Sequence, residues 1–375
     1  MQSFFCAGST KRRAWKVGEM DRKDRARDVN ISHRKMLMIF VMFLVAAICL
    51  IVLWGQQEAR TAHQRDLFAM DTFFTLTAYG PQAEEGLESC ILRVRELEDL
   101  LSVTAEGSDV RKINGDGFTS VSTDTYWLIK TAKEICGETE GALDITLYPV
   151  LREWGFTTGA YTIPKQEKLE ELLQRVDYSQ IYLNEEARTI SVPAGSELDL
   201  GAVAKGYTGD CLMNILKEQG VTSAMLDLGG NIQTLGTKPD GSPWRIAVKN
   251  PFDSSEMIGV LEVVDKAVIT SGSYERYFVG EDGNRYWHIL DPADGYPADS
   301  GLVSVTIVGE SGTRCDGLST ALFVMGKERA VDFWEQHSDF EMILVTEDGK
   351  IYFSEGLEDC FECSEHLSAE KITRG

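Results

Sequence analysis

The chain has 375 residues, enough for one large domain or for two smaller ones of about 100–200 residues each. Its formal net charge of −22 is unevenly distributed, because residues 1–35 carry a net +6, residues 36–55 carry no charge, and the remaining 320 residues carry −28. A general nucleic-acid binder needs basic side chains to displace counterions from phosphates, so the acidic part is unsuited to that role. A hydrophobic content of 43% also excludes a disordered chain.

The uncharged residues 36–55 predict a transmembrane signal anchor. Twenty mostly apolar residues in a helix span a hydrocarbon core about 30 Å thick. The basic tail, residues 1–35, precedes them, so the positive-inside rule places this tail in the cytoplasm and residues 56–375 outside. A cleaved signal peptide and a lipoprotein signal at Cys49 are the alternatives. The first lacks a clear small-residue cleavage site, and the second has Ile48 where a small residue is expected.

The pattern of apolar side chains predicts the elements of the outer part. Residues 56–66 are polar and are expected to form a stalk. In chain order, the expected elements are a strand at 72–79, helices at 81–102, 124–136 (ended by Gly137) and 164–175, a hairpin of 181–184 and 189–192, a helix at 202–219 (ended by Gly220), strands at 224–227, 244–248, 259–264, 267–270, 286–290 and 302–308, helices at 315–324 and 327–337, and strands at 342–346 and 351–353.

Strands that follow one another, with helices interspersed irregularly, favour an α+β fold with mostly antiparallel or mixed sheets over a doubly wound parallel one. We expect residues 67–357 to form one folded domain and residues 358–375 to form an acidic tail. This tail contains Cys360 and Cys363, a Cys-x-x-Cys pair for which a local disulfide outside the cell, a zinc site or two plain apolar side chains are the alternatives.

Two segments in the middle of the chain contain candidate binding residues. Residues 141–156 place Asp144 in an apolar setting ahead of Trp154, and residues 199–210 place Lys205 on the opening turn of a helix. A lysine and free N–H groups at the start of a helix suit a phosphate. The plainer interpretations are a helix-capping aspartate with a buried tryptophan, and a helix that carries a lysine without further purpose.

Two later segments contain candidates for acid–base chemistry and for metal binding. His288 lies in the Gly- and Asp-rich residues 270–297, and Asp316 and Thr320 are spaced i, i+4 in residues 314–324. This spacing directs both oxygens from one helix face, which suits a hard cation such as Mg²⁺. The alternatives are a core histidine, a capping aspartate and a threonine bonded to its own helix.

Taken together, these segments form an ordered set of motifs. In chain order, they are Met70-Asp71-Thr72, Gly141-Ala142-Leu143-Asp144, Trp154-Gly155-Phe156, Asp199-Leu200-Gly201, Ala204-Lys205-Gly206-Tyr207 with Asp210, Gly229-Gly230-Asn231, Thr270-Ser271-Gly272, Tyr274-Glu275-Arg276, His288-Ile289-Leu290-Asp291-Pro292 with Gly295, and Asp316 with Thr320-Ala321. From about residue 70 to 346 the chain thereby resembles the ApbE family of flavin transferases, the FAD:protein FMN transferases. It departs from the common family pattern at Asp71, Leu143, Ser273 and Gly317. Of these, Asp71 adds a side chain next to the expected flavin pocket.

The resemblance implies a Mg²⁺-dependent transfer of the FMN half of FAD to a Thr or Ser hydroxyl of an extracytoplasmic flavoprotein, with release of AMP. Such acceptors include subunits of membrane redox complexes. It places the metal on Ala202 (through its carbonyl oxygen), Asp316 and Thr320. It places FAD against Met70, Ala142, Leu143, Asp144, Asp199, Lys205, Ser271 and Ile289, and makes His288 the candidate base, with Asp316 and Lys205 as the other catalytic residues.

These implications define a single-pass protein of the cell membrane whose catalytic domain lies on the extracytoplasmic side. Two alternatives stay open. The same site would serve a Mg²⁺-dependent FAD pyrophosphatase that gives FMN and AMP, and a membrane-tethered module that binds flavin without catalysis would need fewer of these residues.

Overall fold

The computed structural model describes residues 25, 27, 30, 32–50 and 60–375. Among the N-terminal residues it contains an apolar helix, Ser32–Leu50, with a mean hydropathy of 1.9. This helix is long and apolar enough to cross a membrane, although a signal sequence passes the same test. Residues 51–55 of the expected anchor and 56–59 of the expected stalk lie outside the described residues.

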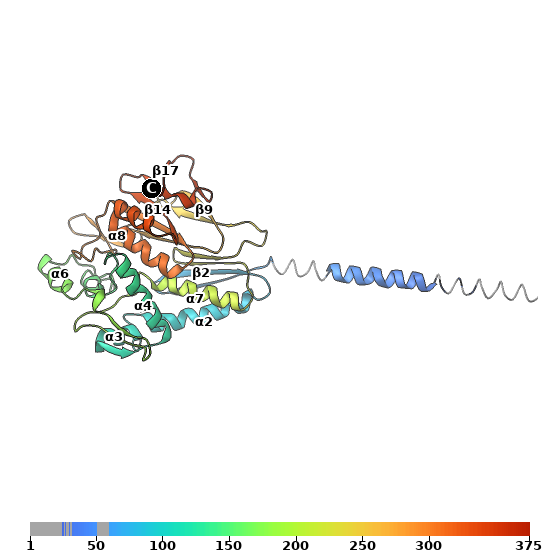
Figure 1. Ribbon diagram of the computed structural model, residues 1–375, viewed down its shortest axis with the longest axis horizontal. Coiled ribbons are helices and arrows are strands. Elements are labelled where there is room, and N and C mark those ends of the chain that lie inside the picture. The colour runs from blue at the N-terminus through green and yellow to red at the C-terminus, as the bar shows by residue number, and fades with distance from the viewer. Residues whose placement is uncertain (1–24, 26, 28–29, 31, 51–59) are drawn as a thin grey trace, which may run out of the picture. The chain divides into compact units, whose positions relative to one another are not determined.

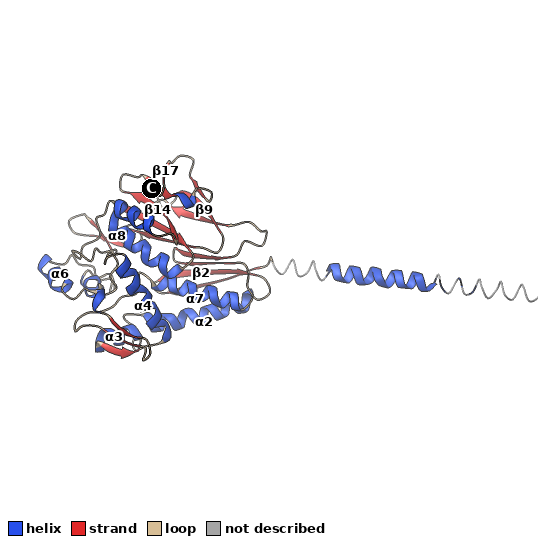
Figure 2. Ribbon diagram, viewed as in Figure 1, coloured by secondary structure: helices blue, strands red, loops and turns tan. Residues whose placement is uncertain are grey.

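Residues Arg60–Gly375 form one compact unit built on a nine-stranded sheet, which Figure 2 shows as red arrows. The strand order is β1-β2-β6-β7-β10-β13-β14-β15-β17, and all neighbours are antiparallel except β15 and β17. The strands are β1 (Ala62–Ala69), β2 (Thr72–Tyr79), β6 (Ala224–Leu228), β7 (Asn231–Leu235), β10 (Ala267–Gly272), β13 (Leu302–Gly309), β14 (Phe340–Thr346), β15 (Ile351–Ser354) and β17 (Ala369–Ile372). The predicted α+β fold with mostly antiparallel strands is confirmed.

The sheet is buried on both faces because apolar residues follow one another along its central strands. Ile269 and Ile307 point into a core shared with the helices, whereas their neighbours Val268 and Val308 point into a second core on the other face. The helices of the first face are α2 (Ala83–Leu101), α4 (Thr123–Glu138), α7 (Ala204–Glu218) and α8 (Gly312–Gln336) (Figure 1). The second core is closed by a three-stranded sheet of β8 (Trp244–Lys249), β9 (Met257–Val263) and β16 (Phe361–Cys363).

Smaller elements complete the unit. They are α3 (Asp109–Asp116), α5 (Tyr148–Glu153), α6 (Gln166–Leu173), the three-stranded sheet of β3 (Phe118–Ser120), β4 (Tyr182–Asn184) and β5 (Thr189–Ser191), the hairpin of β11 (Tyr277–Val279) and β12 (Arg285–Trp287), and two 3₁₀ turns, η1 (Tyr178–Gln180) and η2 (Glu355–Leu357). The two helices expected at 315–324 and 327–337 are joined in α8, which has a non-helical Gly326 at φ 78°.

Both ends of the expected domain need correction. Residues 62–66, expected in a stalk, belong to β1, which pairs along its whole length with β2. Residues 358–375, expected to be a separate tail, contribute β16 and β17, which pair with β9 and β15. Polar side chains on the exposed face of β1 and in the middle of the short β17 conceal these edge strands in the sequence.

Two smaller expectations also differ from the structure. Gly137 lies inside α4 and does not end it, because Thr139 is the C-cap. The strand expected at 286–290 ends at Trp287, so His288 lies just beyond β12. Of the alternatives for Cys360 and Cys363, the structure agrees with apolar side chains, because both thiols are free and pack against the second core.

Candidate active site

One cavity of about 440 Å³ gathers the residues that the sequence singles out. Its lining includes the β1–β2 turn, the end of α2, residues 142–157, the start of α7, the end of β10, the residues beside the β11–β12 hairpin, and α8. All twelve predicted site residues lie in this lining: Met70, Ala142, Leu143, Asp144, Asp199, Ala202, Lys205, Ser271, His288, Ile289, Asp316 and Thr320. Segments up to 250 positions apart in the sequence therefore meet at one site.

Helices α7 and α8 cross closely because glycines stand at the crossing. A Cβ atom on Gly206 would lie 2.1 Å from the carbonyl oxygen of Gly312 and 2.8 Å from the Cβ of Asp316. The close approach lets the backbone N–H of Gly206 donate to Oδ2 of Asp316 at 2.8 Å. The Ala-Lys-Gly-Tyr segment thus positions the α8 carboxylate as well as Lys205.

Asp316 is a buried carboxylate, with 4% of its surface exposed. Burial raises its pKa, while the nearby Lys205 charge and the Gly206 N–H oppose that rise. Thr320 follows one helical turn later, and its Oγ1 lies 3.4 Å from Oγ of Ser271. Asn231 is also buried here, and its Nδ2 has no hydrogen-bond partner in the described part of the chain. Asp316, Thr320, Ser271 and Asn231 all line the cavity, so this corner concentrates polar groups.

The donor set of this corner fits a hard cation. Within residues 60–375 and the described N-terminal residues, no three His, Cys, Asp or Glu side chains cluster as a metal site. Asp316, Thr320 and the carbonyl oxygen of Ala202 all offer oxygen. Mg²⁺ is typically held by one or two carboxylates, with phosphate and water oxygens completing its shell.

His288 is poised as a proton acceptor. Its Nδ1 lies 3.1 Å from the carbonyl oxygen of Arg276, which can only accept, so Nδ1 carries the proton and Nε2 carries the lone pair. Burial of the ring lowers the pKa of His288 to about 4, and the Arg276 and Lys205 charges act in the same direction. The imidazole is therefore neutral at pH 7.

Aromatic packing holds the hairpin that ends at His288. Phe278 of β11 and Tyr286 of β12 stack on each other at 5.4 Å, and Tyr286 lies 5.2 Å from the buried Trp154. Trp154 donates from Nε1 to the carbonyl oxygen of Gly295 at 2.8 Å. The Trp-Gly-Phe motif is thus a support for the hairpin base and for the Asp-Pro-x-x-Gly turn that follows His288.

Comparison with known proteins shows the family of the chain. The sequence profile described as the ApbE family matches residues 70–344, which is more than half of the chain. The chain belongs to the ApbE family. It is similar to an FAD:protein FMN transferase of Klebsiella pneumoniae, with 35% identity over 72% of this chain and 85% of the relative. One of Vibrio cholerae is 36% identical over 68% of this chain and 78% of the relative.

Solved structures show the same family fold. The ApbE protein of Thermotoga maritima has a TM-score of 0.73 and 33% identity, over 82% of this chain and 98% of that chain. The flavin transferase ApbE of Vibrio cholerae also has a TM-score of 0.73, with 29% identity over 80% of this chain and 99% of that chain. The resemblance and the fold predicted from the sequence are confirmed.

The departure of this ApbE protein at Asp71 lies in a tight turn. Met70 (φ 48°) and Asp71 (φ 62°) form the two-residue connection between β1 and β2, and both have positive φ, as a type I′ turn requires. Glycine adopts that backbone more readily than aspartate does. The turn is held by the backbone N–H of Met70, which donates to Oε1 of Glu98 at 2.7 Å.

Asp144 organises the loop that carries two other lining residues, Ala142 and Leu143. Its Oδ1 accepts from the N–H and the hydroxyl of Thr146 at 2.8 and 2.6 Å, and its Oδ2 accepts from the N–H of Tyr178 at 3.1 Å. Burial raises the pKa of this carboxyl group, and these hydrogen bonds oppose the rise. In the free protein Asp144 is therefore a loop-fixing residue.

The lining also contains residues without a predicted role, and three of them are Arg276, Asn231 and Glu98. Arg276 and Asn231 belong to motifs that carry the family resemblance, so a signal was present, but the motifs gave no function. Glu98 lies on the apolar-striped helix α2, where a single acidic residue has no distinguishing pattern. Its contact with Met70 spans 28 positions and became visible only in the fold.

Proposed function

We propose that this ApbE protein transfers the FMN half of FAD to a Thr or Ser hydroxyl of an acceptor protein and releases AMP. The observation that carries the proposal is the neutral His288 in one cavity with the oxygen ligands at Asp316 and the cation of Lys205. The names of the Klebsiella pneumoniae and Vibrio cholerae relatives support the same activity.

In the transfer, Nε2 of His288 accepts the proton of the acceptor hydroxyl. The hydroxyl oxygen attacks the phosphorus of the FMN half, the bridging P–O bond to the AMP half breaks, and AMP leaves with the bridging oxygen. A base in hydrogen-bond reach of the hydroxyl contributes about 10²–10⁴-fold to the rate. Most of the remaining acceleration in phosphoryl transfer comes from positioning and from stabilisation of charge.

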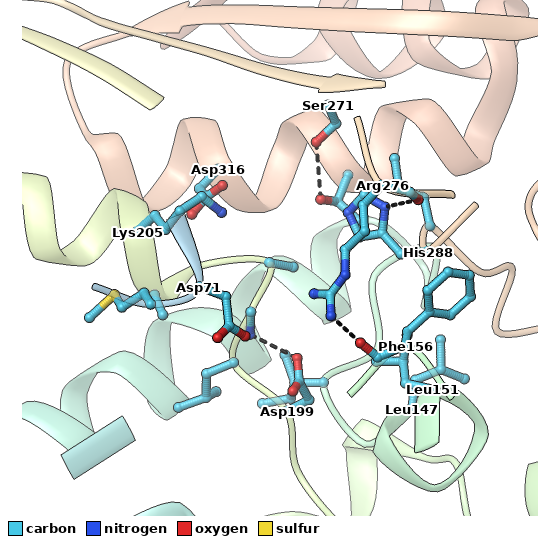
Figure 3. A pocket seen from close by; sticks show the side chains of 18 of the residues that line it. Asp71, Leu147, Leu151, Phe156, Asp199, Lys205, Ser271, Arg276, His288 and Asp316 are labelled. Atoms are coloured by element: carbon cyan, nitrogen blue, oxygen red, sulfur yellow. Dashed lines mark hydrogen bonds between the residues drawn. The ribbon is translucent and has the colours of Figure 1, made fainter. Parts of the chain in front are cut away.

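The two phosphates of FAD enter an acidic part of the chain, so their charge needs local neutralisation. Asp316, Thr320 and the carbonyl oxygen of Ala202 would hold Mg²⁺, which supplies charge neutralisation and orientation for phosphoryl oxygens. Lys205 stands beside Asp316 in Figure 3 and adds a second positive charge there. Met70, Ala142, Leu143, Asp144, Asp199, Ser271 and Ile289 would bind the rest of FAD.

We also propose that residues 36–55 anchor the chain in the cell membrane, with residues 1–35 in the cytoplasm and the compact unit outside. The apolar helix Ser32–Leu50 and the basic residues before it support this topology. The acceptors would then be extracytoplasmic flavoproteins, including subunits of membrane redox complexes.

The test is to incubate the full-length chain in detergent with FAD, Mg²⁺ and a panel of extracytoplasmic flavoproteins. An acceptor should gain the mass of one FMN on a Thr or Ser residue, and AMP should appear in equal amount. If no acceptor gains mass, and free FMN and AMP form at the same rate with and without an acceptor, the protein is instead a pyrophosphatase.

A further inference from the structure

The cavity holds few positive charges for a substrate with two phosphates. Among its lining residues, six are carboxylic acids (Asp71, Glu98, Asp144, Asp199, Glu275 and Asp316) and two are basic, Lys205 and Arg276. An anion is attracted only where one of the two cations, or a bound metal ion, outweighs the carboxylates. The site therefore has two protein positions at which a phosphate oxygen can meet a positive charge.

Lys205 and Arg276 reach the cavity from different elements, α7 and the residues just before β11, and both charges act on His288 and Asp199. Burial raises the pKa of Asp316, and Lys205 lies beside this residue, where its charge opposes that rise. Arg276 lies beside His288 (Figure 3). One phosphate can thus be held beside Asp316 and Lys205, and the other beside His288 and Arg276.

The guanidinium of Arg276 is fixed but largely unused. One of its N–H groups donates to the carbonyl oxygen of Phe156, and the Phe156 ring lies 6.4 Å from the ring of His288. In the part of the chain that the structure describes, Arg276 has no carboxylate oxygen within 4 Å and its other N–H groups make no hydrogen bond, while its charge acts at longer range on the lining carboxylate Asp199. An arginine carries five N–H donors in a planar fork, a shape that matches phosphate oxygens.

We propose that Arg276 binds the phosphoryl group that is transferred, next to Nε2 of His288. This inference rests on the proposed function and assigns a residue to the FMN phosphate. The carbonyl oxygen of Arg276 fixes the tautomer of His288, and its side chain reaches the same wall, so one residue aligns the base with the phosphorus. As the acceptor oxygen bonds to phosphorus and the P–O bond to AMP breaks, the guanidinium stabilises the charge on the oxygens that stay with FMN.

The experiment uses the full-length chain in detergent, with Mg²⁺, and compares R276Q, R276K and R285Q with the unmodified protein. Arg285 is the matched control, since it lies on β12 of the same hairpin with its guanidinium over the Tyr277 ring, outside the cavity lining. Two quantities are measured: the affinities for FMN and for riboflavin, which lacks the phosphate, and the kcat and KM for transfer from FAD.

We expect R276Q to weaken FMN binding at least about tenfold, to leave riboflavin binding within about twofold, and to lower kcat by about 10²–10³-fold with a smaller change in KM. R276K should recover part of the FMN affinity because it keeps the charge, while kcat stays low because the fork is lost. R285Q should match the unmodified protein.

Equal weakening of FMN and riboflavin, or unchanged FMN affinity and kcat in R276Q, would overturn the assignment. If R276Q does not fold, unchanged values in R276K do the same. Because the binding measurements need no acceptor, they decide on Arg276 even if the unmodified chain proves unable to transfer FMN, an outcome that would remove the proposed function alone.

Discussion

Nδ1 of His288 donates to the carbonyl oxygen of Arg276 at 3.1 Å, and the backbone N–H of His288 donates to the same oxygen at the same distance. One carbonyl group thus closes the base of the β11–β12 hairpin and sets the tautomer of the imidazole. With Nδ1 engaged in this contact, Nε2 is the ring nitrogen that carries the lone pair. The proton-accepting atom of the proposed base is therefore defined by backbone geometry.

The pH dependence of transfer should reflect the low pKa of His288. Because the imidazole must be neutral to accept a proton, activity should persist down to its pKa of about 4 and fall below it, and not near the ordinary value of 6.5. The measurement is kcat/KM for FAD between about pH 4 and pH 8. An acid limb centred near 6.5 would contradict the buried, neutral state of His288.

Replacement of the base should remove that acid limb. His288→Gln cannot accept a proton at Nε2, so we expect the rate at pH 7 to fall by about 10²–10⁴-fold and FAD binding to stay close to that of the unmodified protein.

His288 also makes the stability of the fold depend on pH. Between about pH 4 and 6.5 the unfolded chain binds more protons at this residue than the folded one does, so the fold loses stability as pH falls through that window. Urea melts of both proteins separate this loss from the loss of catalysis.

Alanine substitutions at the α7–α8 crossing and inside α4 should change stability in opposite directions. Gly206→Ala places a methyl group 2.1 Å from the Gly312 carbonyl oxygen, so α7 and α8 must separate, and we expect a loss of about 1–3 kcal/mol in unfolding free energy. Gly137→Ala meets only the Tyr178 ring at 3.9 Å inside α4 and should gain about 0.5–1 kcal/mol. Urea denaturation measures both. Equal stability of the two variants would show that the crossing tolerates a side chain.

Strongly periodic segments made much of the fold predictable. The strand at 72–79 was found at its full length, and the helix expected at 81–102 is α2. Strand β1 was missed because Gln64 and Asp66 occupy its exposed face, and α3 is too short for a periodic stripe to stand out. The sequence motifs identified the site residues, but they did not predict how these residues contact one another. No residue type encodes that a carbonyl 12 positions away sets the tautomer of His288, or that α7 supplies an N–H to Asp316.

Asp316 should limit the stability of the metal-free protein. Its buried carboxylate has the N–H of Gly206 but no cation in hydrogen-bond contact within the described residues, and desolvation of such a charge is costly. Asp316→Asn keeps the shape and removes the charge, so in EDTA we expect its Tm to exceed that of the unmodified protein. Mg²⁺ should raise the Tm of the unmodified protein and leave that of the variant unchanged, because a ligand stabilises only the form it binds. Equal responses of the two proteins to Mg²⁺ would remove Asp316 from the metal site.

Asp210 should matter for stability although it lies outside the cavity lining. From α7 it accepts hydrogen bonds from the N–H of Gly312 at 2.7 Å and from the N–H and hydroxyl of Thr313 at 2.9 and 2.8 Å, and thereby caps α8. Asp210→Ala leaves these donors without a partner, so we expect a loss of about 2 kcal/mol in unfolding free energy. Asp332→Ala is the matched control, because Asp332 is exposed on the same helix and should change stability by less than about 0.5 kcal/mol. Urea denaturation compares the two. The cap also fixes the start of the helix that carries Asp316. If Mg²⁺ raises the Tm less in Asp210→Ala than in Asp332→Ala, the cap supports the proposed metal site at Asp316.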